Sequence, residues 1–175
     1  IHEEGVRFGH PCGVRLACLV GGLPKQPQVQ ALRAAPEMVA ATPGRLTDFL
    51  GMGVVKLESV TYLVLDEADR MLDMGFEPQI SRIIGETAPA DQRQTMFFTA
   101  TWPKAVRKMA TKYLKKQGEG LVRLTIGSTE ELAANTACHA ATATVRPPAT
   151  RRQPPSRAIH TAIAGAGGPT SPAIP

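Results

Sequence analysis

The sequence has 175 residues, 43% of them hydrophobic and 5% aromatic, with a formal net charge of +5. This length suits one domain with a buried core, and no apolar run reaches the length of a membrane span. The three cysteines show no C-x-x-C spacing, which argues against a disulfide framework or a zinc site and favours a reducing compartment inside the cell, nucleus or cytoplasm.

Charge and proline are unevenly distributed along the chain. Residues 136–175 contain four arginines and no acidic residue, so residues 1–135 hold the other 16 basic and all 15 acidic side chains. Any nucleic-acid surface on residues 1–135 is therefore local. Residues 136–175 also hold seven of the 15 prolines and show no apolar period, which predicts a disordered tail rich in Pro, Ala and Arg.

Before residue 136, strands and helices alternate. The apolar runs typical of strands are residues 14–20, 38–41, 60–65, 95–98 and 121–126. The segments with a helical pattern are residues 28–35, 43–51, 67–74, 77–86 and 103–116. Thr42 suits the cap of the second of these helices, and Pro43 suits its first position. The alternation predicts an α/β fold, a parallel sheet with helices on both faces.

The helix predicted over residues 103–116 is strongly basic. Its lysines and arginine could form an RNA-facing stripe or a solvated face. The apolar residues Val106, Met109 and Tyr113 recur at helical spacing, which favours the solvated face.

The junctions between strands and helices are the places where chemistry is expected, because ligands of open α/β sheets bind at the carboxyl ends of the strands. Three junctions have unusual sequences: Thr-Pro-Gly-Arg at 42–45, Asp-Glu-Ala-Asp at 66–69 and Thr-Ala-Thr at 99–101.

The acidic junction follows the buried strand 60–65. The carboxylate of Asp66 suits a Mg²⁺ ion that bridges nucleotide phosphates, and Glu67 is placed to orient or deprotonate an attacking water. The alternative is a helix start in which Asp66 is the N-cap and Glu67 and Asp69 lie in the first turn, favoured by the helix dipole. The four residues alone leave both interpretations open.

The other two junctions are less informative by themselves. Residues 42–45 combine a hydroxyl, helix-start amides and a guanidinium, which suits a nucleic-acid phosphate. An ordinary capped helix with a surface arginine fits the same residues and is favoured when they are considered alone. Thr99 and Thr101 alone indicate only a turn.

In this order and spacing, the three junctions resemble the DEAD-box ATP-dependent RNA helicases of superfamily 2. Residues 64–80 resemble the block around motif II, which contains the family's name-giving Asp-Glu-Ala-Asp. Residues 41–46 resemble motif Ib, residues 94–103 resemble motif III, and Gly21-Gly22 resembles the family's GG element. The resemblance covers roughly residues 1–135.

The resemblance implies a RecA-like domain and a set of site residues. Asp66 would contact Mg²⁺, and Asp66 and Glu67 would face ATP, with Glu67 positioning the hydrolytic water. Asp69 would bond to the hydroxyls of Thr99 and Thr101 and so link the ATP state to domain closure. Thr99 replaces the serine that usually opens motif III and keeps its hydroxyl. The residues implied in sequence-independent contact with RNA sugar-phosphate are Gly21, Gly22, Thr42, Pro43, Gly44 and Arg45.

Two motifs of the family do not occur in the sequence: the A-x-x-G-x-G-K-T phosphate loop and the glutamine motif. We expect residues 1–127 to be a partial N-terminal RecA-like domain that starts after motif Ia, and residues 128–135 to begin the link to a second RecA-like domain. The resemblance ends abruptly near residue 135, which favours a reading-frame error over a basic RNA-binding extension.

The sequence suggests three candidate functions. The first is an ATP-dependent RNA helicase that uses ATP and Mg²⁺, binds the RNA backbone and couples ATP hydrolysis to local duplex unwinding, with no membrane partner. The second is a catalytically inactive RNA- or partner-binding module without a phosphate loop. The third, a metal-dependent hydrolase, is disfavoured because no histidine lies near Asp66 in the sequence.

Overall fold

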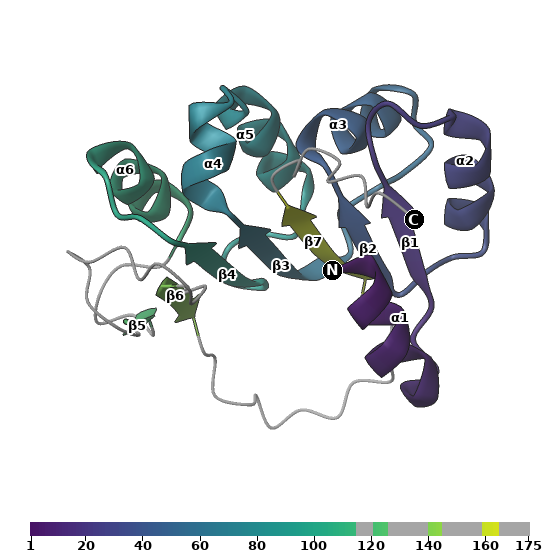
Figure 1. Ribbon diagram of the computed structural model, residues 1–175, viewed down its shortest axis with the longest axis horizontal. Helices are drawn as coiled ribbons and strands as arrows, with labels where there is room; N and C mark the ends of the chain where they lie inside the picture. Colours follow the sequence, from purple (N-terminus) through teal and green to yellow (C-terminus); the bar gives the residue numbers. More distant parts are fainter. Residues whose placement is uncertain (115–120, 126–139, 145–158, 165–175) are drawn as a thin grey trace, which may run out of the picture.

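A computed structural model of the chain describes residues 1–114, 121–125, 140–144 and 159–164. Within these residues the strands form one seven-stranded sheet in the order β1-β2-β7-β3-β4-β6-β5 (Figure 1). The strands are β1 Leu16–Leu19, β2 Met38–Ala41, β3 Val60–Asp66, β4 Gln94–Thr99, β5 Leu121–Leu124, β6 Ala140–Thr144 and β7 Ile159–Ala164.

Helices cover both faces of this sheet. They are α1 His2–Gly9, α2 Lys25–Arg33, α3 Pro43–Gly51, α4 Ala68–Asp73, α5 Glu77–Glu86 and α6 Lys104–Tyr113, and a 3₁₀ turn, His10–Cys12, follows α1. Figure 1 shows α2 to α6 along one face and α1 on the other. The predicted α/β fold, with a parallel sheet between two helical layers, is confirmed for these elements.

The strands that precede the three unusual junctions run in the same direction. β1 pairs in parallel with β2, from Leu16 opposite Met38 to Leu19 opposite Ala41. β3 pairs in parallel with β4 over four residues, and β7 pairs in parallel with both β2 and β3. The carboxyl ends of β1, β2, β3 and β4 therefore lie at one edge of the sheet.

The core lies between the sheet and the layer of α2 to α6. On β3, Leu63 and Leu65 are fully buried, and they belong to one cluster with Phe97 of β4 and Met71 of α4. Full burial of a side chain of this size stabilises the fold by about 1.5–3 kcal/mol. The ends of β3 and β4, where the acidic and threonine junctions begin, are thus anchored in the most buried part of the molecule.

Two strands lie where the composition predicted none. β6 pairs antiparallel with β4 and β5, and β7 runs between β2 and β3. Since β2 and β3 are not adjacent, β7 supplies the backbone partners that their interior edges require. Its sequence, Ile-His-Thr-Ala-Ile-Ala, contains three β-branched residues and is compatible with a strand despite the proline-rich residues before it. The predicted link at 128–135 and the rest of the predicted tail lie outside the described residues.

The basic helix α6 has the solvated face that its spacing favoured. Lys104, Arg107 and Lys108 are exposed, whereas Val106 and Met109 are buried. The helix ends at Tyr113, earlier than expected, and residues 115–116 lie outside the described part of the chain. None of the described helices is both long enough and apolar enough to cross a membrane.

Candidate functional site

Four loops leave the carboxyl edge of the sheet, and the strand order sorts them into two pairs. The Gly21-Gly22 loop follows β1 and the 42–45 junction follows the adjacent β2. The acidic junction follows β3 and the threonine junction follows the adjacent β4. Each pair of neighbouring strands therefore places its two loops beside each other, with β7 between the pairs.

The acidic junction has an unusual backbone. Asp66 is the last residue of β3, and Glu67 has left-handed dihedral angles, φ 53° and ψ 48°. Such a conformation costs a residue with a side chain about 1–2 kcal/mol, and strain of this kind is frequent at functional sites. The Glu67 amide donates to Oδ1 of Asp66 at 3.0 Å, and the Glu67 carboxylate lies 3.2 Å from Nη1 of Arg70.

The helix-start interpretation of this junction is correct only for Asp69. Asp69 lies in the first turn of α4, whereas Asp66 is the last residue of β3 and is not the N-cap. The helix α4 begins at Ala68, one residue later than that interpretation requires, and its N-cap position is Glu67. No side chain makes a capping hydrogen bond at this end of α4. Asp66 instead belongs to the strand, so it stands at the sheet edge where a ligand would bind.

Asp69 and Thr101 connect the two loops of the acidic pair. Oδ2 of Asp69 accepts hydrogen bonds from the Thr101 hydroxyl at 2.6 Å and from the Thr101 amide at 2.9 Å. The hydroxyl of Thr99, which is fully buried, donates to the Thr101 carbonyl at 2.8 Å. The contact expected between Asp69 and Thr101 is thus present in the structure.

These hydrogen bonds set the ionisation of Asp69. Partial burial of its carboxylate raises its pKa, but hydrogen bonds from the hydroxyl and amide of Thr101 and from the amide of Arg70 lower it. The net pKa of Asp69 is below its ordinary value. The carboxylate is therefore charged near neutral pH and remains a strong acceptor for Thr101.

In the other pair of loops, Gly21 and Thr42 lie together. The Gly21 amide donates to the Thr42 hydroxyl at 3.2 Å, and the Thr42 amide donates to the Leu19 carbonyl at 2.9 Å. Thr42 occupies the N-cap position of α3, as predicted, but its side chain makes no capping hydrogen bond. Its hydroxyl accepts the hydrogen bond from Gly21 instead. Gly22 has φ +79°, a conformation that favours glycine.

Arg45 is buried beside this loop rather than extended into solvent. Its side chain is 7% exposed, its Nη2 donates to the Leu23 carbonyl at 2.9 Å, and its guanidinium carbon lies 5.7 Å from the centre of the Phe49 ring. Its Nη1 is buried and has no hydrogen-bond partner among the described residues. A buried donor without a partner is costly, and an incoming acceptor would satisfy it.

A cavity of about 440 Å³ lies over this pair of loops. The residues that line it are Val20, Gly21, Gly22, Thr42, Gly44, Arg45, Asp48 and Phe76. The first amide that donates within α3 is that of Leu46, to the Thr42 carbonyl, so helix geometry leaves the amides of Gly44 and Arg45 without intrahelical partners. Pro43 has no amide hydrogen and occupies the first helical position, as predicted. Asp48 is paired with Lys25 at 3.0 Å.

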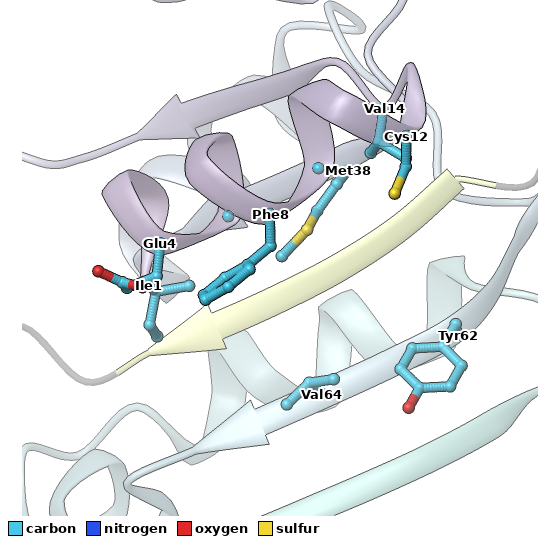
Figure 2. Close-up of a pocket in the computed structure, with 10 residues that line it drawn as sticks. Ile1, Glu4, Phe8, Cys12, Val14, Met38, Tyr62 and Val64 are labelled. Atoms are coloured by element: carbon cyan, nitrogen blue, oxygen red, sulfur yellow. The ribbon is translucent and has the colours of Figure 1, made fainter.

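A larger cavity, about 610 Å³, lies between α1 and the sheet (Figure 2). Ile1, Phe8, Met38, Tyr62 and Val64 are among its lining residues, and no residue of the four loops reaches it. Tyr62 and Val64 alternate with the buried Leu63 and Leu65, so this cavity is on the face opposite α2 to α6. The lining residues that the structure describes are mostly apolar, and the one charged side chain among them is the Glu4 carboxylate, which would repel a phosphate, so the candidate site is not here.

The acidic junction offers carboxylates that could bind a metal ion. Among the residues that the structure describes, no three or more His, Cys, Asp or Glu side chains gather as a metal cage. Mg²⁺ does not need one, because it is usually held by one or two carboxylates together with phosphate oxygens and water. The carboxylate of Asp66, at the end of β3, fits that mode of binding.

Comparison with known proteins decides the family. The profile of the DEAD/DEAH box helicase family matches residues 1–109. The chain belongs to this family. It is 53% identical over 137 residues to rice DEAD-box ATP-dependent RNA helicase 40, and 52% identical over 135 residues to the ATP-dependent RNA helicase DBP2 of Gibberella zeae. These alignments cover 78% and 77% of the chain but only 16% and 23% of the two relatives.

Solved structures of this helicase family have the same fold. The crystal structure of a hypothetical ATP-dependent RNA helicase from Sulfolobus tokodaii is 33% identical, with a TM-score of 0.60, over 66% of this chain and 34% of that one. The yeast DEAD-box splicing factor Prp28 is 31% identical, with a TM-score of 0.61, over 65% of this chain and 27% of that one. The chain therefore has the RecA-like helicase fold and spans less than a quarter of the two curated relatives.

One residue near the glycine loop of this DEAD-box chain could have been selected from the sequence but was not. Gln28 of α2 is 7% exposed and makes three hydrogen bonds to the loop that carries Gly21 and Gly22. The sequence did contain a signal for Gln28. At helical spacing, Gln28 lies on the same stripe of α2 as Ala31 and Leu32, which pack against the core. A polar residue within an apolar stripe indicates a specific hydrogen-bonding task.

Proposed function

We propose that the chain is the part of an ATP-dependent RNA helicase that binds the RNA backbone and positions the water that hydrolyses ATP. Its four loops on one sheet edge provide two separate chemistries. The loops after β1 and β2 present amides, a hydroxyl and a guanidinium, which are donors. The loops after β3 and β4 present carboxylates and hydroxyls.

The RNA half of the proposal rests on Nη1 of Arg45, which is buried and has no hydrogen-bond partner in the part of the chain that the structure describes. A phosphate oxygen in the cavity over Gly21, Gly22, Thr42 and Gly44 would satisfy that nitrogen, and the free amides at the start of α3 would add donors. These groups contact phosphate and sugar and carry no information about bases, so binding is independent of sequence. The ion pair with Lys25 reduces the repulsion that Asp48 would exert on a phosphate.

For hydrolysis, we assign Asp66 to the Mg²⁺ ion and Glu67 to the attacking water. A bound Mg²⁺–ATP complex would supply the phosphoryl group and neutralise the charge that develops on it. The left-handed backbone turns the Glu67 side chain away from the course of the strand, and Arg70 holds its carboxylate at 3.2 Å. Asp69, through Thr101, joins the loop of Glu67 to the loop after β4, so a shift of one loop moves the other.

The assignment of Glu67 is tested in a longer version of the protein that includes a phosphate-binding loop and a second RecA-like domain. Glu67→Gln is expected to reduce phosphate release at least about 100-fold, as for loss of a general base, and to leave ATP-dependent RNA binding intact. Glu58→Gln, at an exposed position, is the matched control. Hydrolysis near the wild-type rate in Glu67→Gln would contradict the assignment.

The 175-residue chain alone is expected to show no RNA-stimulated ATPase. Its sequence has no Gly-Lys-Thr or Gly-Lys-Ser to hold the phosphates, and phosphoryl transfer depends mainly on positioning and charge stabilisation. Phosphate release is measured with and without single-stranded RNA. Turnover above the blank that disappears in Glu67→Gln would show that this expectation is wrong.

A second candidate function is an RNA- or partner-binding module without catalysis. The lack of a phosphate loop within the 175 residues favours it for this chain taken alone. Nucleotide dependence separates the two functions. A non-catalytic module binds single-stranded RNA equally well with and without ATP, whereas the longer helicase binds RNA more tightly when ATP is present.

A further inference from the structure

The loop of residues 20–24 joins β1 to α2 and carries Gly21 and Gly22. Glycine loses more conformational freedom on folding than any other residue, so a loop with two glycines needs other groups to hold one conformation. Backbone amides bind an anion well only when they already point at it. The side chains that fix this loop therefore bear on RNA affinity even if they never touch RNA.

Gln28 supplies most of that support. Its Oε1 accepts a hydrogen bond from the Val20 amide at 3.1 Å. Its Nε2 donates to the Val20 carbonyl and to the Pro24 carbonyl, each at 3.1 Å. A glutamine amide has two N–H donors, and both are used on this loop. One side chain thus ties together the two ends of the loop that contains the glycines.

Two other side chains hold the residues in between. The Thr42 hydroxyl accepts from the Gly21 amide, and Nη2 of Arg45 donates to the Leu23 carbonyl. Among the glutamines of α2, Gln26 and Gln30 are exposed, whereas Gln28 is 7% exposed. Because burial of an amide is costly unless it is bonded, the contacts with the loop account for the position of Gln28 in the apolar stripe.

We propose that Gln28 is a positioning residue of the RNA site. It holds Gly21 and Gly22 in the conformation in which their backbone faces the RNA sugar-phosphate, and it acts through Val20 and Pro24 without touching RNA. The proposal rests on the proposed function, because it takes the cavity over these loops as the RNA site.

The first measurement is amide hydrogen exchange on the 175-residue chain. Gln28→Met keeps the length of the side chain and removes all three hydrogen bonds, and Gln30→Met is the matched control on the same helix. The amides of Val20 and Gly21 are expected to exchange about tenfold faster in Gln28→Met, while that of Leu63 in the core is unchanged. Gln30→Met is expected to match the wild type at all three amides.

The second measurement is the affinity of the same variants for a fluorescein-labelled oligouridylate at fixed salt. Gln28→Met is expected to raise the dissociation constant about fivefold with the protein still folded, and Gln30→Met to leave it unchanged. Gln28→Glu tests whether the hydrogen bonds can be restored. The ionised carboxylate of this variant only accepts hydrogen bonds and is repelled by the Val20 and Pro24 carbonyls. The protonated acid can both accept a hydrogen bond and donate one. The affinity of Gln28→Glu for the oligouridylate, relative to wild type, is therefore expected to increase as the pH is lowered from about 8 to about 5.

The outcomes separate the two proposals. If the wild-type chain does not bind oligouridylate, the proposed RNA contact fails, and the exchange rates still decide whether Gln28 holds the loop. Unchanged exchange at Val20 and Gly21 in Gln28→Met overturns the positioning role, as does faster exchange with unchanged affinity. If Gln28→Met does not fold, Gln28→Glu provides the test. The proposal is overturned if the affinity of Gln28→Glu for oligouridylate, relative to wild type, stays equally low from about pH 8 to about pH 5.

Discussion

Replacing Thr101 by valine tests the link between the acidic loop and the threonine loop. The change removes the hydroxyl that donates to Asp69 at 2.6 Å and keeps the shape of the side chain and the amide that donates at 2.9 Å. A hydrogen bond to a charged group contributes about 1.5–3 kcal/mol when buried, but Thr101 is exposed and Asp69 is half-buried, so water replaces part of the loss. We expect the free energy of unfolding to fall by about 1 kcal/mol.

The loss of stability in Thr101→Val should depend on pH, and the lowered pKa of Asp69 determines the direction of that dependence. The pKa of Asp69 in the folded protein is below its ordinary value. A carboxyl group of this kind stabilises the fold above its ordinary pKa, and that stabilisation is lost as the pH falls through the lower, folded-state pKa. The difference between wild type and Thr101→Val is therefore expected to be largest near pH 7 and to shrink below about pH 4.

Urea unfolding followed by circular dichroism, near pH 7 and near pH 3, measures both effects. Thr61→Val is the matched control, since Thr61 is an exposed threonine on β3 whose hydroxyl makes no hydrogen bond among the described residues. A double-mutant cycle with Asp69→Ala isolates the pair and should give a coupling energy of about 1 kcal/mol. Equal losses for Thr61→Val and Thr101→Val, or a loss that does not change with pH, would refute the reasoning.

Two further predictions concern backbone strain and an ion pair. Glu67→Gly should be more stable than Glu67→Ala by about 1 kcal/mol in urea unfolding, because glycine adopts φ 53° without strain; equal stability would count against that strain. Hydrogen bonds from the side chain and amide of Arg15 lower the pKa of Glu37 to about 2, so its stabilising effect is present above its ordinary pKa and lost as the pH falls towards 2. In a carboxyl NMR titration, Arg15→Met should raise the pKa of Glu37, and Lys25→Met should leave it unchanged. An unchanged pKa of Glu37 in Arg15→Met would disprove the pairing.

The fold was largely predictable because its main signals are local. The apolar run at 60–65 predicts a buried strand, and β3 covers it. The order of the strands was not predictable, because it depends on pairing between distant segments. Ile159 lies opposite Val60, for example, and no local pattern joins residues so far apart. The tail was predicted from its composition, which describes the average of residues 136–175 and overlooks the two strands β6 and β7.

The site shows the same division between local pattern and spatial contact. The residue pattern placed Asp66, Glu67 and Asp69 at the end of a strand, because strand ends are recognisable in the sequence. The resemblance to the DEAD-box helicases was needed to prefer a site over a helix start. Thr42 occupies the predicted N-cap position, but its hydroxyl accepts a hydrogen bond from the Gly21 amide in the loop after β1, and no local pattern predicts this contact. Gln28 was missed for the same reason: its three partners lie in a loop that only the folded chain brings near.

The length of the resemblance around motif II has a structural reason. Residues 64–80 extend well beyond the carboxylates that we assign to ATP and Mg²⁺, and the structure shows where the extra residues lead. After α4, Gly75 turns the chain with φ +76°, and the Phe76 amide donates to the Met71 carbonyl at 2.9 Å. Phe76 then lines the cavity that Arg45 and the glycine loop also line. One continuous segment, from Asp66 to Phe76, therefore runs from the proposed hydrolytic site to the proposed RNA site.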